Sequence, residues 1–244
     1  NEPHVILEKL DGSMIRPIVD PETNKLRFCT KAGYSDVAAQ VDQWVADKAP
    51  HITIFCLDMI RDGFTPIFEW CSRKMRIVID HPCDRLVLTG LRDNDTGQYV
   101  SYWYMKEVAE NLYNIEVVKC FDQSLSAADF VAWAKVQKGT EGFVVRWSSG
   151  LMVKVKTEDY MTVHHTLDIL KSEKHILKAV TTDVVDDVVA GMRASDRTAV
   201  LDYALKVNEG IAKFADDVVA LVLAGPRTRR EFADYARQTS LGMA

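Results

Sequence analysis

The stretch Val5-Ile6-Leu7-Glu8-Lys9-Leu10-Asp11-Gly12-Ser13 lies near the start of the 244-residue chain and decides how the rest is interpreted. Its apolar run predicts a buried strand, and Gly12 allows the chain to turn tightly beyond it. Lys9 would then lie at the end of a strand. A lysine is a poor nucleophile at its ordinary pKa, but neighbouring positive charge favours its amine form. Taken alone, the stretch is explained equally well by a charged turn after a strand. Residues elsewhere in the chain that could act together with Lys9 must therefore decide between the two interpretations.

Three further segments supply partners for such a lysine. Phe68-Glu69-Trp70 places a carboxylate inside an apolar strand, where it is costly unless it binds a ribose hydroxyl or a hydrated metal. Glu141 precedes Gly142 at the start of another strand, and this glycine permits close approach of the backbone. Lys154-Val155-Lys156 puts two ammonium groups on one strand face, where they could bind a phosphate. Each segment alone fits a solvated strand face, but together and in this order they favour nucleotide chemistry on lysine.

The four segments resemble motifs I, III, IV and V of the covalent nucleotidyltransferases, the superfamily of ATP-dependent ligases and capping enzymes. Residues 30–33 resemble motif Ia. The sequences of residues 76–79, 91–102 and 154–160 resemble more specifically the phage-type RNA ligase 1 family. This resemblance covers most of residues 4–165.

The resemblance implies an ATP-dependent RNA ligase that works in three steps. Lys9 attacks the α-phosphate of ATP and becomes lysyl-AMP, AMP passes to an RNA 5′-phosphate, and an RNA 3′-hydroxyl then attacks the activated end. The implied substrates are single-stranded RNA or nicked tRNA ends, with RNA or tRNA repair as the role. Family members carry a longer segment before the motif I lysine that orients the β- and γ-phosphates. Only eight residues precede Lys9, so we expect that the first step needs a further N-terminal segment.

The resemblance also implies roles for individual residues. Glu69 would hold the ribose, and Glu141 with Glu69 would hold Mg²⁺ or Mn²⁺ through water. The catalytic residues would be Lys9, Glu141, Lys154 and Lys156, the last two contacting the α-phosphate. Further contacts to the nucleotide would come from Glu8, Lys31 and Arg92.

The pattern of the chain predicts an α+β fold in two parts. Residues 1–157 contain short β-type runs, at 4–7, 51–57, 67–70, 76–79, 86–91, 99–102, 115–118, 142–147 and 151–156. Helices are predicted at 35–49, 105–113 and 127–137, and a hairpin loop at 93–97. The resemblance makes this part the adenylation (ATP-grasp-like) domain, with antiparallel sheets and flanking helices. Residues 158–244 show helical periodicity and predict a small all-helical domain.

The composition limits the class of protein. There are 30 Lys and Arg against 35 Asp and Glu, a net charge of −5, which excludes a polybasic binder but not a local basic groove. No apolar run reaches the roughly 20 residues of a membrane span. Five cysteines without a CxxC pair argue against disulfides and structural zinc. We therefore expect a cytoplasmic monomer with no membrane and no obligate protein partner, in the host cytoplasm if a phage encodes it.

Other interpretations remain open. Asp186 and Asp187 could bind a cation, although a solvated helix face explains them more simply. The chain could also be a DNA-end ligase or adenylyltransferase, or a truncated, non-adenylating relative that binds nucleic acid. DNA ligases and capping enzymes would carry an OB-fold after residues 154–156, whereas the pattern there is helical.

Overall fold

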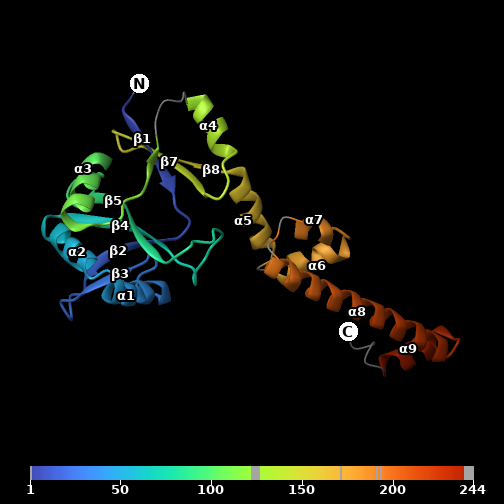
Figure 1. Ribbon diagram of the computed structural model, residues 1–244. Coiled ribbons are helices and arrows are strands. Elements are labelled where there is room, and N and C mark those ends of the chain that lie inside the picture. The colour runs from blue at the N-terminus through green and yellow to red at the C-terminus, as the bar shows by residue number, and fades with distance from the viewer. Residues whose placement is uncertain (1, 122–126, 171, 191, 193, 239–244) are drawn as a thin grey trace. The chain divides into compact units, whose positions relative to one another are not determined.

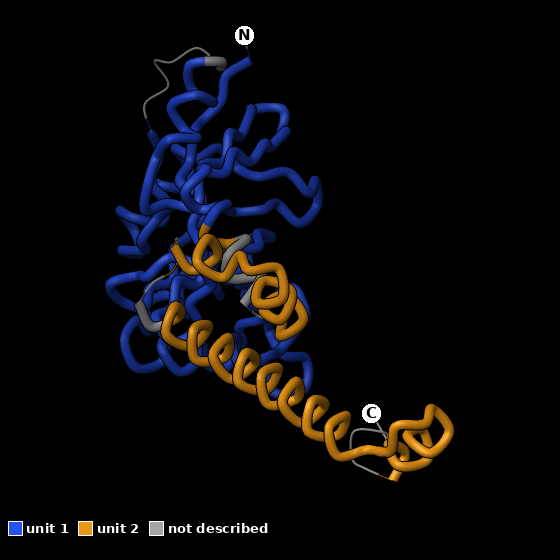
Figure 2. The backbone as a smooth tube through the Cα atoms, turned by 90° about the vertical axis from the view of Figure 1, so that its right-hand side faces the viewer, with its two compact units in different colours: residues 1–162 blue, residues 163–244 orange. Residues whose placement is uncertain are grey.

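The computed structural model describes residues 2–121, 127–170, 172–190, 192 and 194–238. Two compact units are distinguished in it, residues 1–162 and residues 163–244 (Figures 1 and 2). The first unit holds the strands, and the second holds helices α6 to α9.

Two four-stranded sheets, both built from antiparallel ladders, form the first unit (Figure 1). One has the order β6-β1-β7-β8, with β1 His4–Lys9, β6 Cys120–Phe121, β7 Gly142–Trp147 and β8 Met152–Lys156. The other has the order β3-β2-β4-β5, with β2 Ser13–Val19, β3 Leu26–Cys29, β4 Phe64–Cys71 and β5 Arg85–Asp93. The predicted α+β class with antiparallel sheets is confirmed.

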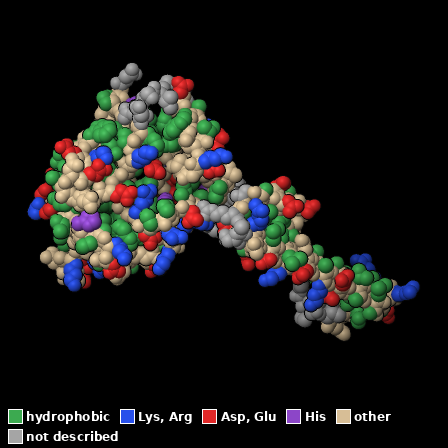
Figure 3. All heavy atoms as spheres, in the orientation of Figure 1, with side chains coloured by type: hydrophobic (Ala, Val, Ile, Leu, Met, Phe, Trp, Pro, Cys, Tyr) green, Lys and Arg blue, Asp and Glu red, His purple; other side chains and the backbone are tan. Residues whose placement is uncertain are grey.

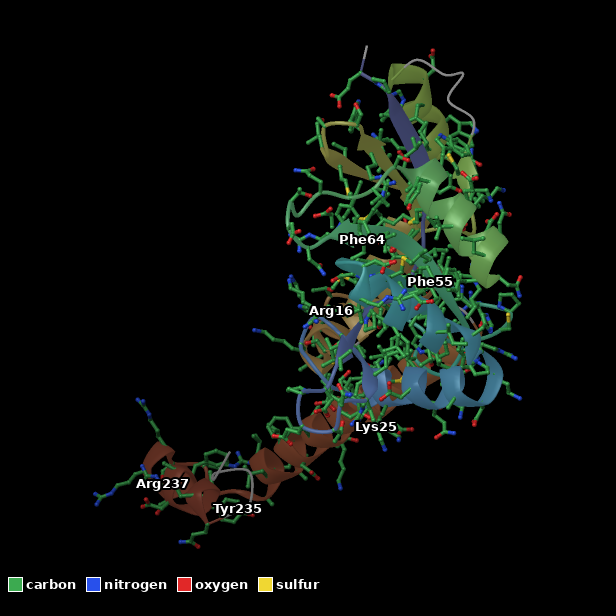
Figure 4. The ribbon with its side chains drawn as sticks, turned by 90° about the vertical axis from the view of Figure 1, so that its left-hand side faces the viewer. Arg16, Lys25, Phe55, Phe64, Tyr235 and Arg237 are labelled. Carbon is green, nitrogen blue, oxygen red and sulfur yellow. The ribbon has the colours of Figure 1, made fainter. Side chains whose placement is uncertain are left out.

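Helices cover both sheets and close the core. Helix α1 (Asp36–Lys48) and helix α2 (His51–Arg61) pack on the β3-β2-β4-β5 sheet, where Phe55, labelled in Figure 4, meets Phe68 edge-on at 6.3 Å between ring centroids. Helix α4 (Ala127–Lys135) covers the other sheet and buries Phe130 against Phe143. Helix α3 (Tyr102–Lys106) continues into a π-helical segment, η1 (Glu107–Leu112).

The predicted strand at residues 51–57 is wrong, because these residues belong to α2. Its β-branched and aromatic residues suggested a strand, yet the buried positions Ile52, Phe55, Cys56 and Met59 follow helical spacing. The segment follows Pro50, a residue that favours the beginning of a helix.

Three other predicted runs do not form strands either. At 76–79, the backbone N–H groups of Val78 and Ile79 donate to the carboxylate of Asp11 instead of to a neighbouring strand. At 115–118, only Val117 forms a bridge, a parallel one to Leu88. At 99–102, a single bridge joins Tyr99 to Arg92 before α3 begins. Conversely, β2, β3 and β6 lack a strong alternating pattern and were not predicted.

The second unit is helical in the part that the structure describes, which agrees with the predicted periodicity. Helix α5 (Glu158–Leu170) runs across the boundary between the units, and α6 (Glu173–Thr181), α7 (Val185–Ala190), α8 (Ala194–Ala224) and α9 (Arg229–Arg237) follow. Its core contains Ile176, Val189, Met192 and Val200. Helix α8 ends before Gly225-Pro226. None of the described helices is long and apolar enough to cross a membrane.

Candidate active site

Lys9, Glu141 and Lys156 form an ion-pair cluster at one end of the β6-β1-β7-β8 sheet. Lys9 Nζ lies 2.6 Å from Glu141 Oε1, and Lys156 Nζ lies 3.3 Å from the same oxygen. The strand register explains the meeting, because Lys9 is opposite Gly142 and Gly142 is opposite Lys156. The Glu141 side chain is only 6% exposed, and the two ammonium groups are its ion-pair partners.

Gly142 makes this close approach possible. Its φ is +150°, and a Cβ atom there would lie 2.1 Å from the carbonyl oxygen of Val155. A side chain would therefore push β8 away from β7 and move Lys156 from Glu141. The expectation that Gly142 permits close approach of the backbone is confirmed.

Glu69 belongs to the other sheet, on β4, yet it faces the same cluster. It accepts a hydrogen bond from the backbone N–H of Gly12, and burial raises its pKa to about 7. Lys9 counteracts this rise, whereas the charges of Glu141 and Asp11 add to it. The charges of Glu141 and Asp11 thus disfavour the ionised form of Glu69, which is the situation that a bound cation relieves.

A cavity of about 380 Å³ opens beside the cluster, between the two sheets. Its wall includes the charged residues Glu8, Lys9, Glu69, Arg146 and Lys154. Apolar side chains line the rest, among them Leu7, Ile67 and Val144. An apolar cavity with a few charged groups on its wall is typical of a small-molecule site, and its lysines suit a phosphate.

Not all of the residues predicted for the site line this cavity. Lys156 lies outside the cavity wall but contacts Glu141. Lys31 is exposed in the turn after β3, and Arg92 donates to the carbonyl of Gly97 in the 93–97 turn; neither lines the cavity. Asp186 and Asp187 are exposed in the first turn of α7, in the other compact unit.

No cluster of three or more potential metal ligands (His, Cys, Asp or Glu) occurs among the residues that the structure describes. The protein side chains around Lys9 therefore offer two nearby carboxylates rather than a complete cage. This is the donor set expected for a magnesium ion that keeps most of its water.

Asp11 is a site residue whose role the sequence did not reveal. Its buried carboxylate accepts hydrogen bonds from the backbone N–H groups of Val78 and Ile79, at 2.8 and 2.7 Å, and from the Tyr160 hydroxyl at 2.8 Å. Its carbonyl oxygen lies 2.7 Å from His81 Nε2. Asp11 thereby fixes the turn after Lys9 to two distant segments of the first unit.

Arg146 was also missed, although an arginine within an apolar strand is a detectable signal. Arg146 is 6% exposed, and burial lowers the pKa of its guanidinium. It donates to the carbonyl of Val100 at 3.3 Å and lies 5.8 Å from the centre of the Tyr99 ring.

Comparison with known proteins agrees with this geometry. A family model described as RNA ligase matches residues 1–160. A curated protein of Thermovibrio ammonificans, provisionally named an RNA ligase, is 23% identical over 193 residues, covering 76% of this chain and 49% of its own length. The chain thus spans about half the length of the curated relative.

Solved structures share the fold. A variant of the Naegleria gruberi RNA ligase with ATP and Mn matches with a TM-score of 0.53 and 15% identity, covering 67% of this chain and 52% of its own. An archaeal ATP-dependent RNA ligase matches with a TM-score of 0.55 and 13% identity, covering 97% of this chain and 67% of its own. With the family model matching residues 1–160, the chain belongs to the phage-type RNA ligase family.

Proposed function

We propose that the protein is an ATP-dependent RNA ligase that joins RNA 5′-phosphate and 3′-hydroxyl ends through lysyl-AMP and an RNA adenylate. The observation that carries this proposal is the ion-pair cluster of Lys9, Glu141 and Lys156, of which Lys9 lines a nucleotide-sized cavity and the other two lie beside its wall. Glu69 faces them from the opposite sheet. Such a cluster combines a nucleophile, phosphate-binding cations and carboxylates for a metal.

The first step forms one bond and breaks another. The neutral amine of Lys9 attacks the α-phosphorus of ATP, the P–N bond forms, and the bond to the bridging oxygen breaks so that pyrophosphate leaves. Lys9 loses one proton before the attack, for which Glu141, 2.6 Å away, is the proposed acceptor, and its nitrogen loses a second proton to water as the P–N bond forms. Lys154, on the cavity wall, and Lys156 stabilise the charge that develops on the phosphate oxygens.

The residues present fit a hydrated divalent cation, Mg²⁺ or Mn²⁺. The raised pKa of Glu69 supports this, because a nearby cation favours the ionised form of its carboxyl group. Glu69 and Glu141 would hold the ion through water, and Glu69 would also hold the ribose. Such an ion, when bound, neutralises charge on the reacting phosphates.

The later steps transfer AMP to an RNA 5′-phosphate and then release it as the 3′-hydroxyl attacks. We propose single-stranded RNA or nicked tRNA ends as substrates, and repair of broken RNA as the role. The relatives named above as RNA ligases support RNA rather than DNA. We further propose residues 1–157 as the adenylation domain and residues 158–244 as a separate helical domain.

The proposal is tested by ligation assays with matched strands. The protein, ATP and Mg²⁺ are incubated with 5′-phosphorylated RNA or with DNA of the same sequence, and closed products and AMP release are measured. We expect circular or joined RNA and stoichiometric AMP, with little joined DNA. Preferential joining of DNA would support the DNA-end ligase instead. RNA binding without AMP release, from ATP or from preadenylated RNA, would support a non-adenylating relative.

A further inference from the structure

A second cavity, of about 270 Å³, lies at the other end of β1 from Lys9. Its walls come from the start of β1, the segment that leads into α3, and the end of β7. Aromatic side chains dominate them: His4, Tyr99, Tyr102, Trp103 and Trp147. This cavity belongs entirely to the first unit.

Trp103 is the most exposed of these aromatic side chains. It is 61% exposed, although the protein holds it in place. Ser101 caps α3 by accepting a hydrogen bond from the N–H of Tyr104, and the buried Tyr102 ring packs edge-on against the Trp103 ring at 5.0 Å. A positioned, exposed indole face is the form of side chain on which a nucleobase stacks.

Arg146 supplies a cation to the same cavity. No Asp or Glu of the described residues forms an ion pair with its guanidinium, which donates to the carbonyl of Val100. A guanidinium that is largely removed from water and lacks a carboxylate partner is unfavourable until an anion binds. Arginine favours phosphate because its fork of donors matches phosphate oxygens.

The second cavity adjoins the one beside Lys9. Tyr99 and Arg146 line both, so they form the partition between them. His4 and Lys9 are the first and last residues of β1, so strand geometry separates them by about 16 Å. The occupant of the second cavity is therefore not the phosphate that reacts at Lys9.

We propose that the second cavity binds a nucleotide of the RNA strand, near but not at the reacting end. Its base stacks on Trp103, and a phosphate of the strand pairs with Arg146. This site rests on the proposed function, because it assumes that the strand reaches the cavity beside Lys9. It assigns Trp103 to RNA binding and not to the reaction with ATP.

The test compares Trp103→Ala with Tyr104→Ala, a neighbouring residue on α3 that is 54% exposed and does not line the cavity. Binding of a 5′-phosphorylated, single-stranded oligoribonucleotide is measured by fluorescence anisotropy. Labelling with ATP is measured in parallel. We expect Trp103→Ala to weaken RNA binding by about tenfold and Trp103→Phe to retain most of it. Tyr104→Ala should bind as the wild type does, and labelling should be unchanged in all three variants.

Equal RNA affinity of Trp103→Ala and Tyr104→Ala would overturn the site. Free AMP that binds in a Trp103-dependent manner as tightly as the oligonucleotide would also overturn it, because the occupant would then be a mononucleotide. Absence of labelling in the wild-type protein of full natural length, with the Trp103 effect on RNA intact, would contradict the proposed function and leave the RNA site standing.

Discussion

The Tyr160 hydroxyl donates a hydrogen bond of 2.8 Å to Asp11 Oδ1, joining two residues that are 149 positions apart in the chain. Asp11 follows Lys9 by two residues, and Tyr160 follows Lys156 by four. The bond therefore ties the turn beside the proposed nucleophile to the helix that follows β8, the strand proposed to bind phosphate. Both side chains are buried.

Tyr160→Phe removes this bond and leaves the packing of the ring. We expect the free energy of unfolding to fall by about 1–2 kcal/mol, since the lost bond is to a carboxylate. Denaturant titration measures the change, and Tyr104→Phe, at an exposed position, is the matched control. Combined with Asp11→Ala, which removes the acceptor, the loss should be less than additive. Additive losses would mean that the two side chains do not interact.

Glu141→Gln should impair the reaction with ATP more than it impairs folding. The variant removes the negative charge that pairs with Lys9 and Lys156, so we expect labelling of Lys9 to slow by about 100-fold. Stability should fall by about 1–3 kcal/mol, because two neighbouring ammonium groups lose their shared partner, although Lys156 is partly solvated. Single-turnover labelling and urea unfolding separate the two effects. Glu209→Gln, on the exposed part of α8, should change neither the labelling rate nor the stability. Normal labelling of Glu141→Gln would mean that Glu141 takes no part in the reaction.

Gly142→Ala tests the close approach of β7 and β8. The added Cβ would overlap the Val155 carbonyl, so we expect destabilisation of about 2–4 kcal/mol and loss of labelling. Gly139→Ala is the control, because Gly139 also has a positive φ, +72°, but open space for a Cβ. It should cost only about 1 kcal/mol, from backbone strain alone. Equal costs for the two variants would mean that crowding at Gly142 is unimportant.

The raised pKa of Glu69 predicts a pH dependence of stability in metal-free buffer. The folded protein holds the proton up to about pH 7, whereas the ordinary pKa is 4.5. Between these values the folded state binds more protons than the unfolded state, so stability falls as pH rises from about 4.5 to 7. Relative to Glu69→Gln, the wild type should lose about 2–3 kcal/mol over this interval. Parallel stability curves for the two proteins, measured with a chelator present, would refute the assignment.

Of the residues that the sequence singled out, Lys9, Glu141 and Lys156 lie together in the structure, and the roles proposed for them stay predictions. Lys9, Glu69, Glu141, Lys154 and Lys156 carry charges inside strand patterns, and a charge in such a place indicates a function. Residues 51–57 were misassigned because short apolar runs do not distinguish a strand from a buried helix.

The contacts that support the site could not be predicted from local sequence patterns, because they join residues far apart in the chain. Asp11 binds residues 67, 68 and 149 positions away, and only the folded chain shows why its carboxylate is buried. The net charge of −5 also did not indicate the ion-pair cluster of Lys9, Glu141 and Lys156. Figure 3 shows basic and acidic side chains interspersed over the visible face of the first unit. The cytoplasmic location, the monomeric state and the cation role of Asp186 and Asp187 stay predictions.

Covalent labelling of the protein in its full natural length tests the central claim most directly. The protein is incubated with ATP and Mg²⁺, its intact mass is measured, and the modified peptide is sequenced by mass spectrometry. We predict the gain of one adenylyl group on Lys9 and no gain in Lys9→Arg, while Lys25→Arg, at the exposed position labelled in Figure 4, gains it as the wild type does. An adenylyl group on another residue, or equal labelling of Lys9→Arg, would contradict the account.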